Sequence, residues 1–204
     1  THPRFRDVWF WLIPFSNGRC SIGVVGKEAT IDIDGKDLGD TLKAHTYEAP
    51  MLARLLKDAV WDTPVRTIKS YSKDVKQLYG DKYILLGNAS EFLDPVFSSG
   101  VTIAMYSARL AGHLVPRILK GESVDLENEY AKPLMIGINA FRTYVNGWYS
   151  GEFQDVIYTK IENHDIKRQI CSILAGYAWD TSNPFVTKSD TALKTLWEYT
   201  KSMQ

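Results

Sequence analysis

The sequence lacks the features that would assign it directly to several common classes of protein. Lys plus Arg and Asp plus Glu both number 24 in 204 residues, so no basic surplus indicates a nucleic-acid partner. No apolar run reaches the roughly 18 residues of a membrane-spanning helix. The two cysteines, Cys20 and Cys171, are too few for a disulfide framework and fit a reducing compartment. We therefore expect a cytoplasmic protein that has no membrane span and binds no nucleic acid.

Several catalytic motifs are also missing. The sequence contains no Gly-x-Ser-x-Gly nucleophile elbow, no phosphate-binding Gly-Lys-Ser/Thr loop and no Gly-x-Gly-x-x-Gly dinucleotide fingerprint. The histidines show no metal-ligand spacing among themselves, so we predict no metal site. They are His2, His45, His113 and His164.

Aromatic residues, in contrast, are plentiful. They make up 12% of the chain, with 6 Trp, 11 Tyr and 8 Phe. Such side chains bury a large apolar area in a core, and they also suit a pocket for a planar ring. With 45% hydrophobic and 24% charged residues, the chain has the ordinary composition of a folded domain with a sizeable core.

The first part of the chain predicts a β-hairpin over Val8 to Gly26. Two β-branched and aromatic runs flank Asn17-Gly18, a pair that accepts the positive φ angles of tight turns. Apolar residues occupy both faces of the first run, so we expect this strand to be covered on two sides.

The next segments predict helices and two further strands. Residues 40–59 have helical spacing, with Pro50 beginning a second helical piece. Val65 to Ser72 alternates like a strand, and Tyr83 to Leu86 is a short apolar run typical of a buried strand.

A long helix is expected from about Ser99 to Lys120, after a loop over Gly87 to Phe97. Its predicted apolar stripe consists of Val101, Ala104, Met105, Ala108, Ala111, Val115 and Ile118. The remainder, from Tyr130 to the end, predicts helices broken near Gly147, Gly151 and Asn183-Pro184. The fold class is therefore α+β, and we expect the tail aromatics to lie mainly in a core.

The segment from Leu85 to Val101 carries the clearest chemical signal. It predicts a strand, a polar loop and a helix that begins at Ser98-Ser99-Gly100. Free amides at a helix start attract anions, and Gly100 leaves the backbone open to a ligand. The same serines would also serve as ordinary helix caps. From the residues alone, an anion or cofactor site and a capped core helix both remain open.

Two motifs in this order resemble the flavin-dependent halogenases, within the wider hydroxybenzoate-hydroxylase-like flavoproteins. Gly87-Asn88-Ala89 followed by Asp94 to Val101 is similar to their second flavin-binding motif. Trp9 to Pro14 has the form of their Trp-x-Trp-x-Ile-Pro signature, and Tyr71-Ser72 fits the usual approach to the flavin strand. The resemblance covers Val8 to about Lys120 well and the helical tail loosely.

The resemblance implies an FAD-dependent oxidoreductase in which reduced flavin and oxygen oxidise halide to halogenate an electron-rich aromatic substrate. The residues it places at the cofactor are Asn88, Asp94, Pro95, Phe97, Ser98, Ser99, Gly100 and Val101. It further implies halide near the backbone of Ser99 and Gly100, and the substrate side near Trp9 and Trp11. A flavin reductase and a second copy of the chain are the macromolecular partners it suggests, and it names no catalytic side chain here.

Several departures from the family pattern shape this reading. The family's Asp at the position of Asn88 is replaced, and its Rossmann βαβ unit and relay lysine are not found in this chain. We therefore expect a C-terminal portion with half of the flavin site, inactive alone. Residues 1–124 would form the second half of the oxidoreductase core and residues 125–204 a helical C-terminal region. Phe97 replaces the Glu of tryptophan halogenases, which fits the branch that acts on phenolic or carrier-bound substrates, or relatives that do not halogenate.

Two alternatives remain. One is a flavin monooxygenase or geranylgeranyl-reductase-like enzyme of the same superfamily that does not halogenate. The other is a non-catalytic domain that binds an aromatic or hydrophobic partner through the Trp-rich hairpin. Flavin binding separates both enzymes from the binding domain, and a halide-dependent product separates the two enzymes.

Overall fold

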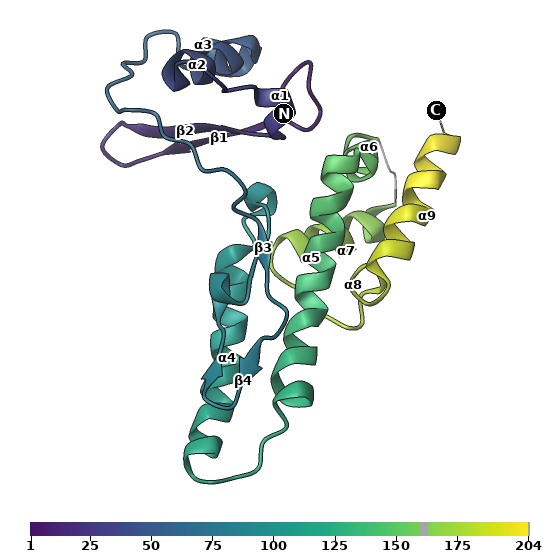
Figure 1. Ribbon diagram of the computed structural model, residues 1–204. Coiled ribbons are helices and arrows are strands. Elements are labelled where there is room, and N and C mark those ends of the chain that lie inside the picture. Colours follow the sequence, from purple (N-terminus) through teal and green to yellow (C-terminus); the bar gives the residue numbers. More distant parts are fainter. Residues whose placement is uncertain (160–162, 204) are drawn as a thin grey trace. The chain divides into compact units, whose positions relative to one another are not determined.

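The computed structural model describes residues 1–159 and 163–203, and its elements are drawn in Figure 1. Two units, Thr1–Lys69 and Ser70–Gln204, each make most of their contacts internally. Helices and short antiparallel strands make up both units, which confirms the α+β class. This boundary lies at residue 69. The predicted division at residue 124 and the predicted lack of a Rossmann unit remain predictions.

The first unit contains the predicted hairpin. Strand β1 (Trp9–Pro14) pairs antiparallel with β2 (Cys20–Val25), with Trp9 opposite Val25 and Pro14 opposite Cys20. The connecting loop is closed by the Phe15 amide, which donates to the Arg19 carbonyl at 2.8 Å. Gly18 takes a φ of +82°, as the Asn-Gly pair predicts.

The expectation that β1 is covered on both faces is wrong. Its first four residues are half-buried, and Ile13 is 51% exposed. The sheet has only two strands, and α2 (Leu38–Glu48) packs on β2. One thin layer cannot cover both faces, so the buried apolar residues lie at the strand ends and on the helices. They are Val8, Val25, Leu42, Ala49 and Leu56.

Three helices complete the first unit: α1 (Glu28–Ile31), α2 and α3 (Pro50–Leu55). Asp37 caps α2 by accepting from the Asp40 amide at 2.9 Å. Pro50 stands at the first turn of α3, which confirms the predicted division of residues 40–59 into two helical pieces.

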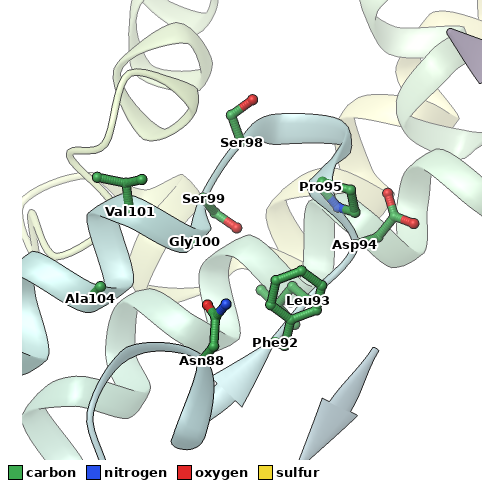
Figure 2. A pocket seen from close by; sticks show the side chains of 10 residues that line it. All are labelled: Asn88, Phe92, Leu93, Asp94, Pro95, Ser98, Ser99, Gly100, Val101 and Ala104. Carbon is green, nitrogen blue, oxygen red and sulfur yellow. The ribbon is translucent and has the colours of Figure 1, made fainter. Parts of the chain in front are cut away.

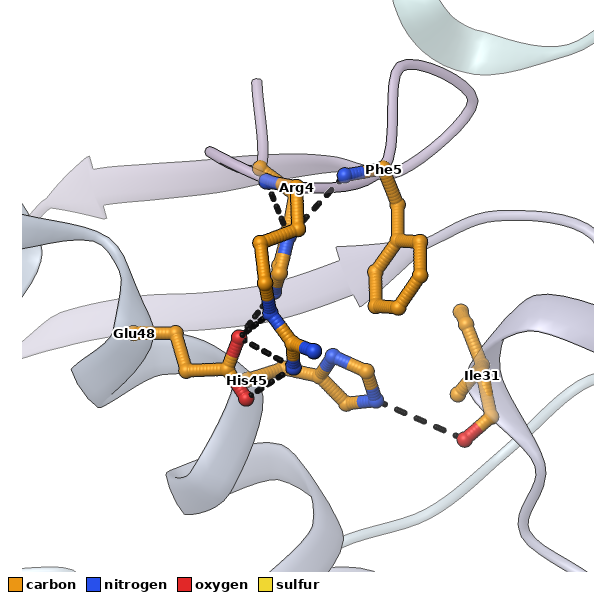
Figure 3. Close-up of polar contacts among 6 residues, drawn as sticks. Arg4, Phe5, Ile31, His45 and Glu48 are labelled. Atoms are coloured by element: carbon orange, nitrogen blue, oxygen red, sulfur yellow. Dashed lines mark hydrogen bonds and ion pairs between the residues drawn. The ribbon is translucent and has the colours of Figure 1, made fainter.

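A buried histidine, His2, joins the start of the chain to α2. Figure 3 shows Arg4 beside Glu48 of that helix. The His2 Nδ1 atom accepts from the Arg4 and Phe5 amides at 3.1 and 3.3 Å, and Nε2 lies 3.2 Å from Glu48 Oε2. Arg4 also pairs with Glu48, at 2.6 Å. Burial lowers the pKa of His2 more than Glu48 raises it, and His45 and Arg4 lower it further. The folded unit therefore favours neutral His2.

From Val65 onward the chain has short strands where longer ones were expected. Val65 to Ser72 forms no strand, and only Lys73–Asp74 (β3) pairs, with β6 (Glu91–Phe92). Tyr83–Ile84 (β5) pairs with Tyr79–Gly80 (β4) in a two-residue ladder. Tyr83 and Leu86 are exposed, so the prediction of a buried strand over residues 83–86 is also wrong. A strand is buried by neighbours on both sides, and in the described part of the chain β5 pairs with β4 alone.

The predicted long helix is confirmed as α4 (Gly100–Leu119), but its buried face differs from the predicted stripe. The buried residues are Ile103, Ser107, Ala111 and Leu114. Of the predicted stripe only Ala111 is buried, whereas Val101 and Met105 are strongly exposed. Apolar residues occupy more than one face of α4, so periodicity alone did not select the face that packs. An apolar face of α4 is therefore exposed.

The rest of the second unit is helical, as predicted. It begins with a π-helical turn, Glu127–Ala131 (η3), and continues in α5 (Lys132–Ser150), α6 (Glu152–Tyr158), α7 (His164–Leu174), α8 (Pro184–Thr187) and α9 (Ser189–Ser202). Gly151 takes a φ of +91° between α5 and α6, and Asn183 caps α8, so both of these predicted breaks are confirmed.

The predicted break at Gly147 is wrong, because Gly147 lies inside α5. A Cβ atom there would lie 2.7 Å from the Leu193 side chain, so the glycine permits close packing of α9. Helix α5 is the centre of this core and contacts α4, α6, α7, α8 and α9. Four of the five aromatic residues between 141 and 153 are buried here, as expected, and Tyr149 is half-buried; the four are Phe141, Tyr144, Trp148 and Phe153.

The two faces of α4 should respond differently to truncation. Ile103 is 1% exposed, so Ile103→Ala should lower the free energy of unfolding by about 3 kcal/mol. Leu119→Ala on the same helix, at 82% exposure, should change it by no more than about 0.5 kcal/mol. Urea unfolding of the two variants measures both values. Equal losses would contradict the assignment of the buried face.

His2 should make the first unit less stable in mild acid. Because folding lowers the His2 pKa below its usual 6.5, the unfolded chain binds the proton more readily. This contribution to stability is complete above about pH 6.5 and is lost as the pH falls toward the folded pKa. The Tm of the wild type should exceed that of His2→Asn at neutral pH, and the two Tm values should converge near about pH 5. Parallel curves would refute the linkage.

Candidate functional site

The segment between β5 and α4 is irregular and is held by side chains of the helical core. Gly87 begins the short 3₁₀ turn η1 (Gly87–Ala89), and its amide donates to Ser107 Oγ of α4 at 3.0 Å. Ser90 Oγ donates to the Gly87 carbonyl at 2.7 Å. Gly87 has a φ of +53°, and a Cβ atom there would lie 3.0 Å from Ala104 Cβ. Glycine thus lets this turn lie close against α4.

Asp94 caps the second 3₁₀ turn, η2 (Pro95–Phe97), and is itself buried. Its Oδ1 atom accepts from the Val96 amide at 2.9 Å. Its Oδ2 atom accepts from the hydroxyls of Tyr71 and Tyr149, each at 2.7 Å. Burial and the hydrogen bond to Asp94 raise the pKa of Tyr71, which keeps that phenol protonated as a donor.

A second acidic residue of this segment is tied to the same helix. The Glu91 carboxylate is buried and lies 3.0 Å from Arg142 Nη2 of α5. Arg142 Nη1 also donates to Asn139 at 2.6 Å, which orients the guanidinium. Arg142 and Tyr149 are seven residues apart on α5, so they lie on the same face two turns apart. That face holds residues 91–94 at two points.

The loop then turns sharply into α4. Ser98 takes a left-handed conformation with a φ of +53°. Ser99 is the N-cap residue, but its side chain makes no capping hydrogen bond, so the expected hydroxyl cap is not formed. The first intrahelical bond reaches back from the Ile103 amide to the Ser99 carbonyl at 3.0 Å. The earlier amides of α4 are those that a helix start leaves for a ligand.

A pocket of about 470 Å³ lies at this helix start (Figure 2). Its residues are Asn88, Phe92, Leu93, Asp94, Pro95, Ser98, Ser99, Gly100, Val101 and Ala104. A Cβ atom on Gly100 would be 3.6 Å from Asn88 Oδ1, an ordinary contact distance, so the glycine lies beside the Asn88 side chain. The pocket combines an apolar wall with an amide side chain and a helix N-terminus.

Seven of the eight residues predicted to contact a cofactor line this pocket. The exception is Phe97, whose ring packs edge-on against Trp148 and Phe153 at centroid distances of 5.8 and 5.6 Å. Sequence reasoning missed Phe92, Leu93 and Ala104. Ala104 follows Gly100 by four residues on α4, so helical periodicity was the signal that would have found it.

Trp9 and Trp11 belong to the first unit. Their ring centroids are 6.3 Å apart, and Trp11 Nε1 donates to Ser21 Oγ at 3.0 Å. The Trp11 ring lies over Gly23 of β2, where any Cβ atom would clash with it. Their placement toward a substrate remains a prediction.

No group of three or more His, Cys, Asp or Glu residues in 1–159 and 163–203 is arranged to hold a metal ion. Among the same residues no helix has the length and hydropathy needed to cross a membrane.

Comparison with known proteins gives consistent matches. Residues 5–178 match the sequence model of the tryptophan halogenase family. A flavin-dependent halogenase of Armillaria mellea, armH5, is 32% identical over 65% of this chain and 27% of its own length. A 1H-pyrrole-2-carbonyl-[peptidyl-carrier protein] chlorinase of Pseudomonas fluorescens is 30% identical over 74% of this chain and 32% of its own length.

Solved structures agree with these matches. A flavoprotein/dehydrogenase from Cytophaga hutchinsonii superposes with a TM-score of 0.91 and 42% identity, over 97% of this chain and 49% of that one. A flavin-dependent brominase, Bmp2, shares the fold with a TM-score of 0.77 and 21% identity. The chain thus spans about a third or less of the curated relatives and about half of these structures.

The Arg142–Glu91 pair should be important for the stability of the loop that forms the pocket. Arg142→Ala leaves the buried Glu91 carboxylate without its cation, and we expect a loss of about 3 kcal/mol in the free energy of unfolding. The matched control is Arg168→Ala, which removes an exposed pair with Asp165 and should cost no more than about 0.5 kcal/mol. Urea unfolding tests both. A neutral Arg142→Ala would show that Glu91 is not held by this ion pair.

Proposed function

The chain belongs to the tryptophan halogenase family, and we propose that it supplies one half of the FAD site of a flavin-dependent, halogenase-like oxidoreductase. The observation that carries this proposal is the pocket at the start of α4, which is lined by seven of the eight residues that the family resemblance places at the cofactor. The relatives named flavin-dependent halogenases support FAD as the cofactor. Because this chain spans only part of their length, the remainder of the enzyme would supply the other half of the site.

The pocket fits a flavin in size and in chemistry. Its volume lies within the range of small-molecule sites, and its apolar wall suits a planar ring. The amides of Gly100 and Val101 would face the edge of the ring that becomes anionic on reduction, where the helix dipole favours negative charge. The Asn88 side chain would accept hydrogen bonds from hydroxyl groups of the cofactor through its oxygen and donate to them through its nitrogen. When bound, FAD would supply the oxidation chemistry, and this chain would orient the ring and exclude water.

Other parts of the chain have proposed roles on the substrate side. The backbone of Ser99 and Gly100 would hold a halide beside the ring, and Trp9 and Trp11 would lie toward the substrate. Phe97 is anchored against Trp148 and Phe153 where tryptophan halogenases have Glu, and this favours a phenolic or carrier-bound substrate. A carrier-bound pyrrole is named in one relative. We further propose a cytoplasmic enzyme that is served by a flavin reductase and assembles with a second copy of itself.

Two observations agree with a contribution of residues 1–124 to the oxidoreductase core. The pocket residues all precede residue 124, and α4 exposes an apolar face that includes Val101 and Met105. We propose that the remainder of the flavoenzyme covers this face. Residues 125–204 would then hold the pocket loop in place through the contacts of α5 with Glu91 and Asp94.

A second candidate function has one observation in its favour. The structure that is 42% identical is described as a flavoprotein/dehydrogenase, without mention of halide. A flavin enzyme of the same superfamily that does not halogenate would use the same pocket. The two candidates differ in whether bromide or chloride appears in the product.

The first experiment compares flavin content with polypeptide length. We expect the 204-residue chain to bind FAD weakly and the longer protein, including the other half of the site, to retain FAD on purification. The visible flavin absorbance and the intact mass of each polypeptide measure this. A halide-dependent product from a phenolic substrate would identify the halogenase, and turnover without halide the second candidate. Absence of flavin from both polypeptides would favour a binding domain.

Substitution at Gly100 should interfere with the cofactor in proportion to side-chain size. We compare Gly100→Ala and Gly100→Leu with the wild type. The added Cβ atom would meet Asn88 Oδ1 at 3.6 Å, an ordinary contact, so we expect both variants to fold. Gly100→Leu would fill the pocket and should weaken FAD binding by about tenfold or more, with Gly100→Ala in between. Flavin titration and thermal unfolding of the three proteins check this. Identical flavin affinities would refute the placement of the site.

A further inference from the structure

The buried Asp94 carboxylate connects three segments that are distant in the sequence. Tyr71 precedes β3, Asp94 lies between β6 and η2, and Tyr149 is in the last turn of α5. Both phenol hydroxyls donate to the same oxygen, Oδ2, at 2.7 Å, and the Val96 amide donates to Oδ1 at 2.9 Å. Asp94 is 7% exposed, so these donors replace most of its hydration.

These hydrogen bonds are stronger than hydrogen bonds between two neutral groups, although both tyrosines are neutral donors. Hydrogen bonds from hydroxyls to a carboxylate are charge-assisted, and the distances of 2.7 Å are typical of that class. The pKa of Tyr71 is raised by burial and by Asp94, which keeps its proton on the phenol. A neutral phenol also brings no counter-charge that would need its own partner.

The position of these contacts points to the pocket wall. Pro95 and Ser98, which line the pocket, are one and four residues after Asp94, and Pro95 to Phe97 form the single 3₁₀ turn that Asp94 caps. Figure 2 shows the Asp94 carboxylate directed away from Asn88 and Ser99. The carboxylate thus holds the turn from the side away from Asn88 and Ser99, where Tyr71 and Tyr149 donate to it.

We propose that Tyr71, Asp94 and Tyr149 form a clamp that positions the pocket wall, Pro95 to Gly100, and that Asp94 acts through this clamp rather than by contacting the cofactor. These three residues are positioning residues. The consequence for flavin binding rests on the proposed function, whereas the clamp itself is a property of the chain and is testable without any ligand.

Hydrogen exchange followed by mass spectrometry tests the clamp in the 204-residue chain. Tyr149→Phe, Tyr71→Phe and Asp94→Asn should each speed exchange in peptides covering Pro95 to Gly100, by about tenfold, because each removes a hydrogen bond to a charged group. Peptides from α9 should keep their wild-type rates. The control is Tyr199→Phe on α9, whose ring is 55% exposed and which should change neither region.

The outcomes separate local from global effects. If Tyr149→Phe speeds exchange throughout the helical core, its effect on the loop is not specific. Tyr71→Phe then provides the test of the clamp, because Tyr71 lies outside that core and donates to the same oxygen. Wild-type exchange over Pro95 to Gly100 in both Tyr71→Phe and Asp94→Asn would overturn the clamp.

A second measurement addresses its consequence in the flavin-binding protein. Tyr149→Phe should weaken FAD binding by about tenfold and alter the visible circular dichroism that the bound flavin acquires from its surroundings. Adding Tyr149→Phe to Asp94→Asn should cause no further loss, because the two residues act as one unit. Faster loop exchange with unchanged affinity and dichroism would overturn the role in binding. Faster loop exchange in the variants, together with a longer wild-type protein that binds no flavin, would confirm the clamp and refute the proposed function instead.

Discussion

The candidate site depends on how a nearly irregular segment, Leu85 to Ser99, satisfies its polar groups. Outside helices and sheets, buried amides and carbonyls need side-chain partners. Here Tyr130 donates to the Leu85 carbonyl, Ser107 accepts from the Gly87 amide and Asp94 accepts from the Val96 amide. Burial raises the pKa of Tyr130 to about 12, so that donor also keeps its proton. The pocket has its shape because residues of α4, η3 and Asp94 itself occupy these positions.

Helix α5 gives this arrangement its rigidity. One face holds the segment through Arg142 and Tyr149, as described above, and another is buried in the helical core. On that side the Tyr144 hydroxyl donates to the Phe185 carbonyl at 3.0 Å, and its ring lies 4.8 Å from that of Phe153. The helices after α5, drawn in green to yellow in Figure 1, therefore support the pocket although none of them lines it. A ligand held by the loop would depend on the packing of the whole tail.

The sequence predicts those elements whose signals are local. Asn17-Gly18 marks the hairpin turn and Pro50 begins α3, because each of these residues is suited to a particular backbone conformation. The failures concern partners. Val65 to Ser72 has strand-like alternation but pairs with no strand of the described chain, and a ladder requires a neighbour. The buried face of α4 was likewise misassigned, since several of its faces are apolar and tertiary contacts decide between them.

The site shows the same limit at the level of single side chains. The motif from Asp94 to Val101 identified the pocket, yet it did not distinguish residues that line it with their backbone from residues whose side chains hold it in place. Phe97 turns its ring into the core, and Asp94 directs its carboxylate to two tyrosines. Tyr149 carried no signal beyond its helical spacing, which placed it with the core aromatics. A motif of this kind combines two requirements, an open backbone at Gly100 and a loop fixed well enough to present it. The second requirement is met by residues 23 and 55 positions from Asp94, which a local pattern does not contain.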